Sequence, residues 1–156
     1  MMYEYLKSNN CTEIINDSLP NIVCNENGKT YKIEFNNRTK AGKIRIDGCL
    51  ISGNTQKKCD FLCITFEYKK AFFVELKGTD DIFEAYEQIK SSIIDLSQKQ
   101  EFIELQDYQI NARIVLARLN NPNIKNDPKT LKFKKFLKKY KNGDVGYNSI
   151  SYVESI

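Results

Sequence analysis

Residues 59–78 read CDFLCITFEYKKAFFVELKG, two apolar runs separated by a short polar link. Each run is predicted to form a strand, and side chains on a strand alternate between its two faces. Glu75 and Lys77 therefore share one face of the second strand. Val74 and Leu76 share the other face. The second strand thus predicts an acidic and a basic side chain next to each other on one face of a sheet.

The polar link at residues 67–70 predicts a hairpin, which can bring Asp60 on the first strand beside Glu75 on the second. One carboxylate from each strand would then hold a cation. Apolar residues surround both acids, so we expect them on partly buried strands, where an unpaired acid is costly and usually has a purpose. A structural ion pair with Lys77 is the alternative use of the same side chains.

The whole chain predicts an α/β fold, a mixed central β-sheet flanked by helices. Its 156 residues suit one globular domain, residues 1–156, rather than two. Apolar positions at spacings of three and four predict a helix over residues 80–96, with Thr79 as its N-cap, and strands separated by such a helix are usually parallel. The other expected elements are a helix at 4–19, strands at 31–35, 43–51, 60–66, 71–77 and 112–117, a turn at 36–42, a loop at 120–126, a helix at 128–140 and an edge strand at 143–153.

The N-terminal segment and the cysteines indicate the cellular setting. Residues 1–10 are polar, and no apolar run approaches the roughly 20 residues that cross a bilayer. We therefore expect a soluble, cytoplasmic protein with no membrane partner. The five cysteines cannot all pair within one chain, and most of them lie in apolar, strand-like segments. Reduced, buried thiols are the expected state.

The chain contains no histidine, which excludes several kinds of chemistry. It cannot build a Ser-His-Asp or Cys-His catalytic site, a histidine-ligated zinc site or an imidazole base. Any metal site must therefore use carboxylate and carbonyl oxygens. These ligands favour magnesium or manganese over zinc.

The order of these features resembles the PD-(D/E)XK, or restriction-endonuclease-like, superfamily. The resemblance rests on Asp60, the ELK triplet at residues 75–77, the helix that follows this triplet and the strand that follows the helix, and it spans roughly residues 31–118. Within the superfamily, the chain is similar to small bacterial and phage proteins through its KCDF, ELKG and EQI segments, the last at residues 87–89. The resemblance implies a restriction-endonuclease-like core.

The resemblance also implies roles for individual residues. The acids that correspond to Asp60 and Glu75 bind magnesium, with manganese possible, and the lysine that corresponds to Lys77 activates or orients water. Hydrolysis of a phosphodiester needs such an aligned water and a counter-charge for the transition state. We expect the Leu76 carbonyl as a further metal ligand, since hard cations accept main-chain oxygens. We expect Gln88, on the following helix, to position water or a phosphate.

Two assignments stay open in the sequence. Many members of the superfamily add an acid from the first helix, and Glu4 and Glu13 are both candidates for that position. Asp47 competes with Asp60 for the role of the first acid, because it also lies in a strand-like segment before the ELK triplet.

A lysine-rich segment at residues 129–141 gives a second signal for nucleic acid. Its apolar residues can dock a helix while its lysines contact phosphates, although a solvated amphipathic face is the alternative interpretation. Arg113 and Arg118 flank an apolar strand and either reach substrate or pair with acids. The residues expected to bind nucleic acid are Lys132, Lys135, Lys138 and Lys139.

Together these features predict a magnesium-dependent nuclease that hydrolyses phosphodiester bonds, of DNA rather than RNA, in restriction or in defence against mobile elements. The net charge of +4 is too modest to predict nucleic-acid binding from the whole molecule. No recognition domain is evident, so a homodimer or a partner protein is the expected source of specificity. The alternative is a non-catalytic module that binds nucleic acid or protein and keeps a vestigial nuclease site.

Overall fold

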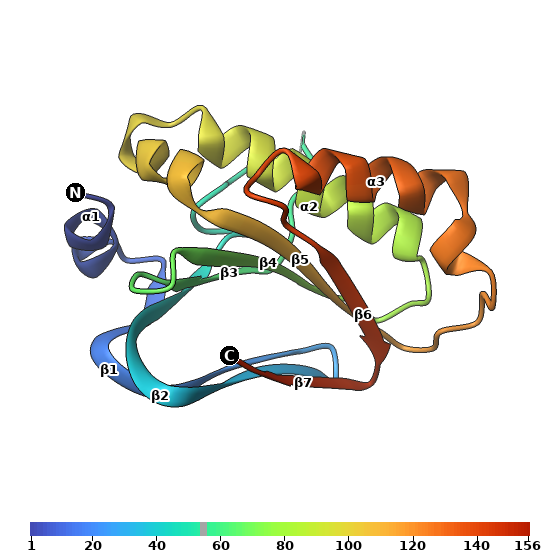
Figure 1. The fold of residues 1–156 in the computed structure, drawn as a ribbon, viewed down its shortest axis with the longest axis horizontal. Coiled ribbons are helices and arrows are strands. Elements are labelled where there is room, and N and C mark those ends of the chain that lie inside the picture. The colour runs from blue at the N-terminus through green and yellow to red at the C-terminus, as the bar shows by residue number, and fades with distance from the viewer. Residues whose placement is uncertain (54–55) are drawn as a thin grey trace.

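The computed structural model describes residues 1–53 and 56–156. A mixed seven-stranded sheet crosses the molecule, and α2 and α3 cover one of its faces (Figure 1). The strands are β1 (Thr12–Glu26), β2 (Lys29–Arg45), β3 (Phe61–Thr65), β4 (Lys70–Leu76), β5 (Gln109–Leu116), β6 (Val145–Ser149) and β7 (Ser151–Ser155). The helices are α1 (Met2–Ser8), α2 (Ile82–Ser97) and α3 (Pro128–Lys138), with 3₁₀ helices η1 (Gln100–Asp107) and η2 (Ile124–Asn126).

The central strands β3, β4 and β5 are buried on both faces of the sheet. β3 and β4 pair antiparallel as the predicted hairpin. β4 and β5, which α2 separates in the sequence, pair parallel as predicted. One face packs against the helices in a core that contains Phe73 and Ile114. The other face packs in a second core that contains Phe72 and Val74. Burial on both faces explains why these strands are continuous apolar runs.

The N-terminal region differs from its prediction. The helix expected over residues 4–19 ends at Ser8, and a long strand begins at Thr12. Ile14, which suggested a buried helix face, is 41% exposed, so the apolar spacing there did not mark a helix. Pairing with β2 overrides the helical pattern. Pro20 is tolerated because β1 is the edge strand at this end of the sheet.

β2 is one continuous strand, so the turn expected at residues 36–42 is wrong, as is the strand expected at 43–51 beyond Arg45. The polar residues 36–38 are exposed, and their pairing region with β1 contains register shifts that allow the hairpin to bend. Residues 30–34 of β2 pair with β7, and its residues 41–45 pair with β3. β2 therefore curls from one half of the molecule to the other and encloses the second core (Figure 1).

The remaining elements follow the predictions with local changes. Asp81, rather than Thr79, caps α2, because its side chain accepts a hydrogen bond from the Glu84 amide. The final helix begins at Pro128 as predicted. The expected single edge strand is divided into β6 and β7 by Ile150, which has a positive φ of 65°. In the described part of the chain, no helix combines the length and apolar composition of a membrane span.

The cysteines depart in part from the expectation of reduced, buried thiols. Cys11 and Cys49 form a disulfide that joins the start of β1 to the turn after β2. Cys24, Cys59 and Cys63 are free and buried, as expected. This pairing was not predicted because residues 43–51 were expected to form a strand, whereas Cys49 lies in the turn after β2.

Candidate active site

Asp60 and Glu75 lie close together where β3 begins and β4 ends. The regular pairing of the two strands ends at Phe61 and Val74, and beyond it the Asp60 amide donates to the Val74 carbonyl at 3.0 Å. Asp60 is near enough for its charge to act on the Glu75 carboxyl. The two acids are only 8% and 5% exposed. The hairpin therefore brings two buried carboxyl groups together, as predicted.

The Asp60 carboxyl is held in place by the backbone of β4. Its Oδ2 accepts a hydrogen bond from the Leu76 amide at 2.8 Å. The Leu76 carbonyl, predicted as a metal ligand, accepts a hydrogen bond from the Asn27 side-chain amide at 2.9 Å. A carbonyl oxygen has two lone pairs, so one acceptor position of Leu76 remains for a ligand.

Glu75 has a buried oxygen with no partner. Within residues 1–53 and 56–156, its Oε2 accepts no hydrogen bond. Burial raises the pKa of Glu75 strongly, and the Asp60 charge raises it further, while Lys77 opposes the shift. A buried acceptor without a partner is costly in a folded protein, so this oxygen is a candidate ligand atom.

More acids surround the pair than the sequence predicted. Burial raises the pKa of Asp60, the Leu76 amide opposes that shift, and the nearby carboxyl groups of Glu26 and Asp47 raise the pKa further. Asp47, the competitor for the role of first acid, lies in the turn after β2, where its Oδ1 is 3.8 Å from the Lys58 ammonium. The Asp60 charge raises the pKa of Glu75 more than the Asp47 charge does, but both acids act on Glu75.

Neither N-terminal acid proposed from the sequence joins this group. Glu13 pairs instead with Lys43 at 3.1 Å and with Arg45 at 3.2 Å, and Glu4 is exposed on α1. Glu26, at the end of β1, comes close to Asp60 in their place. Glu26 was not predicted as a site residue because the sequence pattern did not identify β1 as a strand.

Lys77 and Gln88 are the two remaining residues that were predicted for the site, and both contact or lie on α2. Lys77 alternates with the second-core residue Leu76, so it shares the face of Glu75, and its Nζ is 3.0 Å from Oε2 of Glu84 on α2. Gln88, one turn further along α2, points its Nε2 toward the Lys58 carbonyl at 3.5 Å. Among the described residues, the buried Oε1 of Gln88 has no hydrogen-bond partner. Glu84 therefore links α2 to the strand end that carries Glu75, whereas Gln88 contacts the segment before β3.

The four predicted nucleic-acid-binding lysines lie elsewhere. They are exposed on α3, which packs against α2 and β5, whereas the acids lie between β3 and β4. The structure does not bring these lysines into contact with the acidic pair. The four residues are Lys132, Lys135, Lys138 and Lys139.

Arg113 pairs with acids, which is one of the two roles that the sequence left open for it. It is 6% exposed, and its guanidinium contacts Asp144 at 2.7 Å and both carboxylate oxygens of Glu154. The Tyr31 hydroxyl donates to the same Glu154 at 2.7 Å. This cluster joins β2, β5 and β7 beside the second core and has a structural role.

The acidic pair has the donor chemistry of a magnesium or manganese site. In the part of the chain that the structure describes, no group of three or more His, Cys, Asp or Glu side chains is arranged to hold a metal ion. Asp60 and Glu75 nevertheless fit a hard divalent cation, because they offer carboxylate oxygens and one of these oxygens lacks a partner. They are the residues that would hold such an ion.

The resemblance to a nuclease superfamily stays a prediction from roughly residues 31–118. Comparisons of the chain with protein-family models, with curated proteins and with solved structures found no match. Any activity must therefore be inferred from the geometry and charge of the site itself.

Proposed function

We propose that the protein is a magnesium- or manganese-dependent nuclease with a restriction-endonuclease-like core, acting on DNA rather than RNA. One observation supports this proposal most directly. Asp60 and Glu75 are buried close together, and Oε2 of Glu75 lacks a hydrogen-bond partner among the described residues. Two adjacent buried carboxylates without a compensating cation destabilise a fold, so their presence favours a ligand that carries positive charge.

In this proposal the two acids bind the cation. Asp60, fixed by the Leu76 amide, and Glu75, with its unpartnered oxygen, would hold the cation. A bound magnesium or manganese ion would supply positive charge to a phosphate oxygen and to the attacking water. Because burial raises the pKa of both acids, protons compete with the cation for the same oxygens.

Lys77 and Gln88 serve the substrate in this proposal. Lys77 lies two residues beyond Glu75 on the same strand face, where its charge can offset the negative charge that builds on the phosphate. Glu84 holds the Lys77 ammonium at 3.0 Å and keeps it over the site. The free Oε1 of Gln88 can accept a hydrogen bond from the attacking water.

Cleavage assays test the proposal. Supercoiled plasmid, a single-stranded oligonucleotide and an RNA are incubated with the protein in magnesium, in manganese and in EDTA. We expect cleavage of DNA with either metal and none in EDTA. Glu75→Gln and Lys77→Ala should each lower the rate by at least about 100-fold, as loss of a group that stabilises the transition state does. Lys125→Ala, an exposed change in η2, is the matched control and should cleave at the wild-type rate.

Two outcomes would overturn this proposal. One is cleavage by Glu75→Gln at the wild-type rate, which would point to a contaminating nuclease. The other is a folded wild-type protein that leaves every substrate intact, which would favour a non-catalytic binding module. Light scattering of the same samples, alone and with DNA, tests the expected homodimer.

A further inference from the structure

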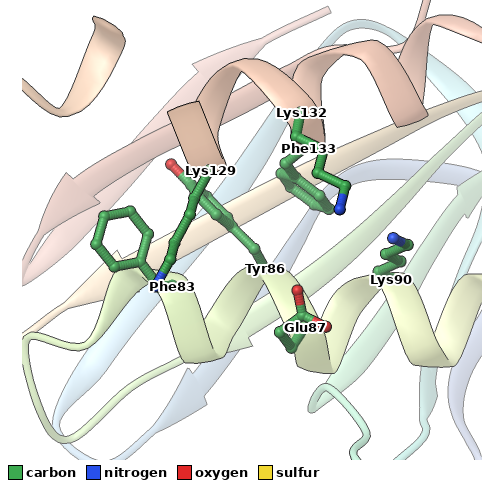
Figure 2. A pocket seen from close by; sticks show the side chains of 7 residues that line it. All are labelled: Phe83, Tyr86, Glu87, Lys90, Lys129, Lys132 and Phe133. Carbon is green, nitrogen blue, oxygen red and sulfur yellow. The ribbon is translucent and has the colours of Figure 1, made fainter. Parts of the chain in front are cut away.

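A groove lies between α2 and α3 (Figure 2). Its volume is about 370 Å³, within the range of roughly 300–1,000 Å³ that is usual for small-molecule sites. None of the proposed catalytic residues lines it. The residues that line this α2–α3 groove are Phe83, Tyr86, Glu87, Lys90, Lys129, Lys132 and Phe133.

The charge of the groove is strongly positive. Lys90, Lys129 and Lys132 contribute three positive charges against the single negative charge of Glu87, so the net charge is +2. Figure 2 shows these lysines reaching over the groove from both helices. A ligand with about two negative charges would therefore balance the groove.

In the described part of the chain, the three groove lysines lack an acidic partner, as do other lysines of α3, whereas several lysines elsewhere in the protein have one. Lys43 and Lys77, for example, form ion pairs at 3.1 and 3.0 Å. Across residues 1–53 and 56–156, none of the groove lysines forms an ion pair. Their ammonium groups remain free to bind an anion.

The floor of the groove is aromatic. Tyr86 and Phe133 stack with ring centroids 4.6 Å apart, and the half-buried Phe83 lies next to Tyr86 with centroids 6.0 Å apart. The Lys129 ammonium sits 4.8 Å from the centroid of the Phe83 ring. Cations over an aromatic face attract an anion above them, while the exposed part of the ring offers a stacking surface. The groove thus combines sites for a phosphate and for a planar ring.

We propose that the α2–α3 groove binds a free nucleoside monophosphate, with the phosphate among Lys90, Lys129 and Lys132 and the base against Phe83. A simple inorganic anion would leave the aromatic floor without a partner. A neutral aromatic ligand would cover three ammonium groups without compensating their charge. Only a ligand that joins both features satisfies the whole groove. The site is separate from the proposed nuclease activity, and binding there needs no divalent metal.

Calorimetric titration in EDTA tests this site without any cleavage. The probes are adenosine and uridine monophosphates, ribose 5-phosphate, adenosine, inorganic phosphate and a 20-nucleotide single strand. We expect the monophosphates to bind at least about 10-fold more tightly than ribose 5-phosphate, adenosine or inorganic phosphate, because each of these lacks one of the two contacts. Binding should weaken as salt rises, as for any contact between lysines and phosphate.

Variants locate the site. The triple change Lys90→Ala, Lys129→Ala and Lys132→Ala should weaken monophosphate binding at least about 10-fold, since it removes charge-assisted hydrogen bonds. The matched control is Lys134→Ala with Lys135→Ala and Lys138→Ala, three lysines of α3 that do not line the groove. Circular dichroism checks that both triple variants fold.

Each of the following results would overturn the inference. Inorganic phosphate that binds as tightly as the monophosphates would indicate a non-specific cationic surface. Equal loss of binding in the two triple variants would indicate an effect of net charge. Binding of the 20-nucleotide strand alone would indicate a nucleic-acid surface instead of a nucleotide site. Because cleavage is not measured, an inactive nuclease site would leave these results unaffected.

Discussion

Two clusters of buried charged groups lie on the central strands, and they are built in opposite ways. Around Arg113, a cation meets the carboxylates of Glu154 and Asp144, and the Tyr31 hydroxyl donates to Glu154. Each charge has an opposite charge and hydrogen bonds. The cost of burying the guanidinium is therefore offset inside the protein.

The Asp60–Glu75 pair is the reverse case. Two acids lie close together, more acids lie nearby, and one buried oxygen has no partner in the described part of the chain. Lys77, the closest cation along the strand, already contacts Glu84. The contrast teaches that burial of charge alone does not identify a functional site. A buried cluster whose charges do not balance is the stronger candidate.

The largest expected effect is on the balanced cluster. Arg113→Ala removes a buried guanidinium and leaves the partly buried Glu154 without its cation, so we expect the free energy of unfolding to fall by about 3 kcal/mol. Urea denaturation followed by circular dichroism measures this change. The exposed change Lys138→Ala is the control and should shift it by less than about 0.5 kcal/mol. A loss below about 1 kcal/mol in Arg113→Ala would remove the distinction between the two clusters.

The next effect concerns pH and the unbalanced pair in metal-free protein. Folding raises the pKa of Asp60 and of Glu75, so the folded state favours their protonated forms. Their contribution to stability is fully present below the ordinary carboxyl pKa of about 4 and is lost as the pH rises through the raised values. Wild type should lose more than about 1.4 kcal/mol relative to Asp60→Asn/Glu75→Gln between about pH 5 and pH 9.

Urea denaturation in EDTA across this pH range gives the measurement. The double variant is its own control for all other titrating groups, because they are the same in both proteins. If the wild type instead gained stability over the variant as the pH rose, other groups in the protein would balance the two carboxylate charges. The pair would then resemble the Arg113 cluster.

Binding of magnesium should change the free energy of unfolding by a slightly smaller amount. At a concentration about ten times its dissociation constant, magnesium should stabilise the folded protein by about 1.4 kcal/mol, since it binds the folded state. The same addition should not stabilise Glu75→Gln, which lacks one carboxylate. Thermal unfolding with magnesium and with EDTA measures this at alkaline pH, where protons compete least. Equal stabilisation of both proteins would place the metal elsewhere.

The smallest effect is expected at Glu84. Glu84→Gln removes the partner of Lys77, but the Glu84 side chain is 45% exposed, so solvent weakens their attraction. We expect a loss of less than about 1 kcal/mol in the free energy of unfolding. Glu87→Gln, an exposed change on the next turn of α2, is the matched control. A loss above about 2 kcal/mol would show that Lys77 belongs to a structural ion pair.

The sequence predicted the centre of this protein better than its ends. The β3–β4 hairpin, α2 and the parallel strand β5 came from apolar periodicity, which is reliable where strands are buried on both faces. β1 and the middle of β2 were missed, because their long pairing tolerates polar residues, a proline and register shifts. Local patterns carry no record of a partner strand that is distant in sequence.

The same limit applies to the candidate site. The proximity of Asp60 and Glu75 followed from the hairpin, so it could be predicted. Glu26 and the Lys77–Glu84 contact depend on the curled β1–β2 hairpin and on the seating of α2, so they could not. The α2–α3 groove likewise needed the packing of two helices.

The curl of β2 has a consequence for how the chain is made. Its residues 30–34 emerge from the ribosome early, but their partner β7 (Ser151–Ser155) emerges more than a hundred residues later. Until then, one side of β2 and the apolar face of the second core stay uncovered on the nascent chain. Exposed edges and apolar surface of this kind are where newly made proteins associate wrongly. Cotranslational protection of the β1–β2 hairpin should therefore decide the yield of native protein.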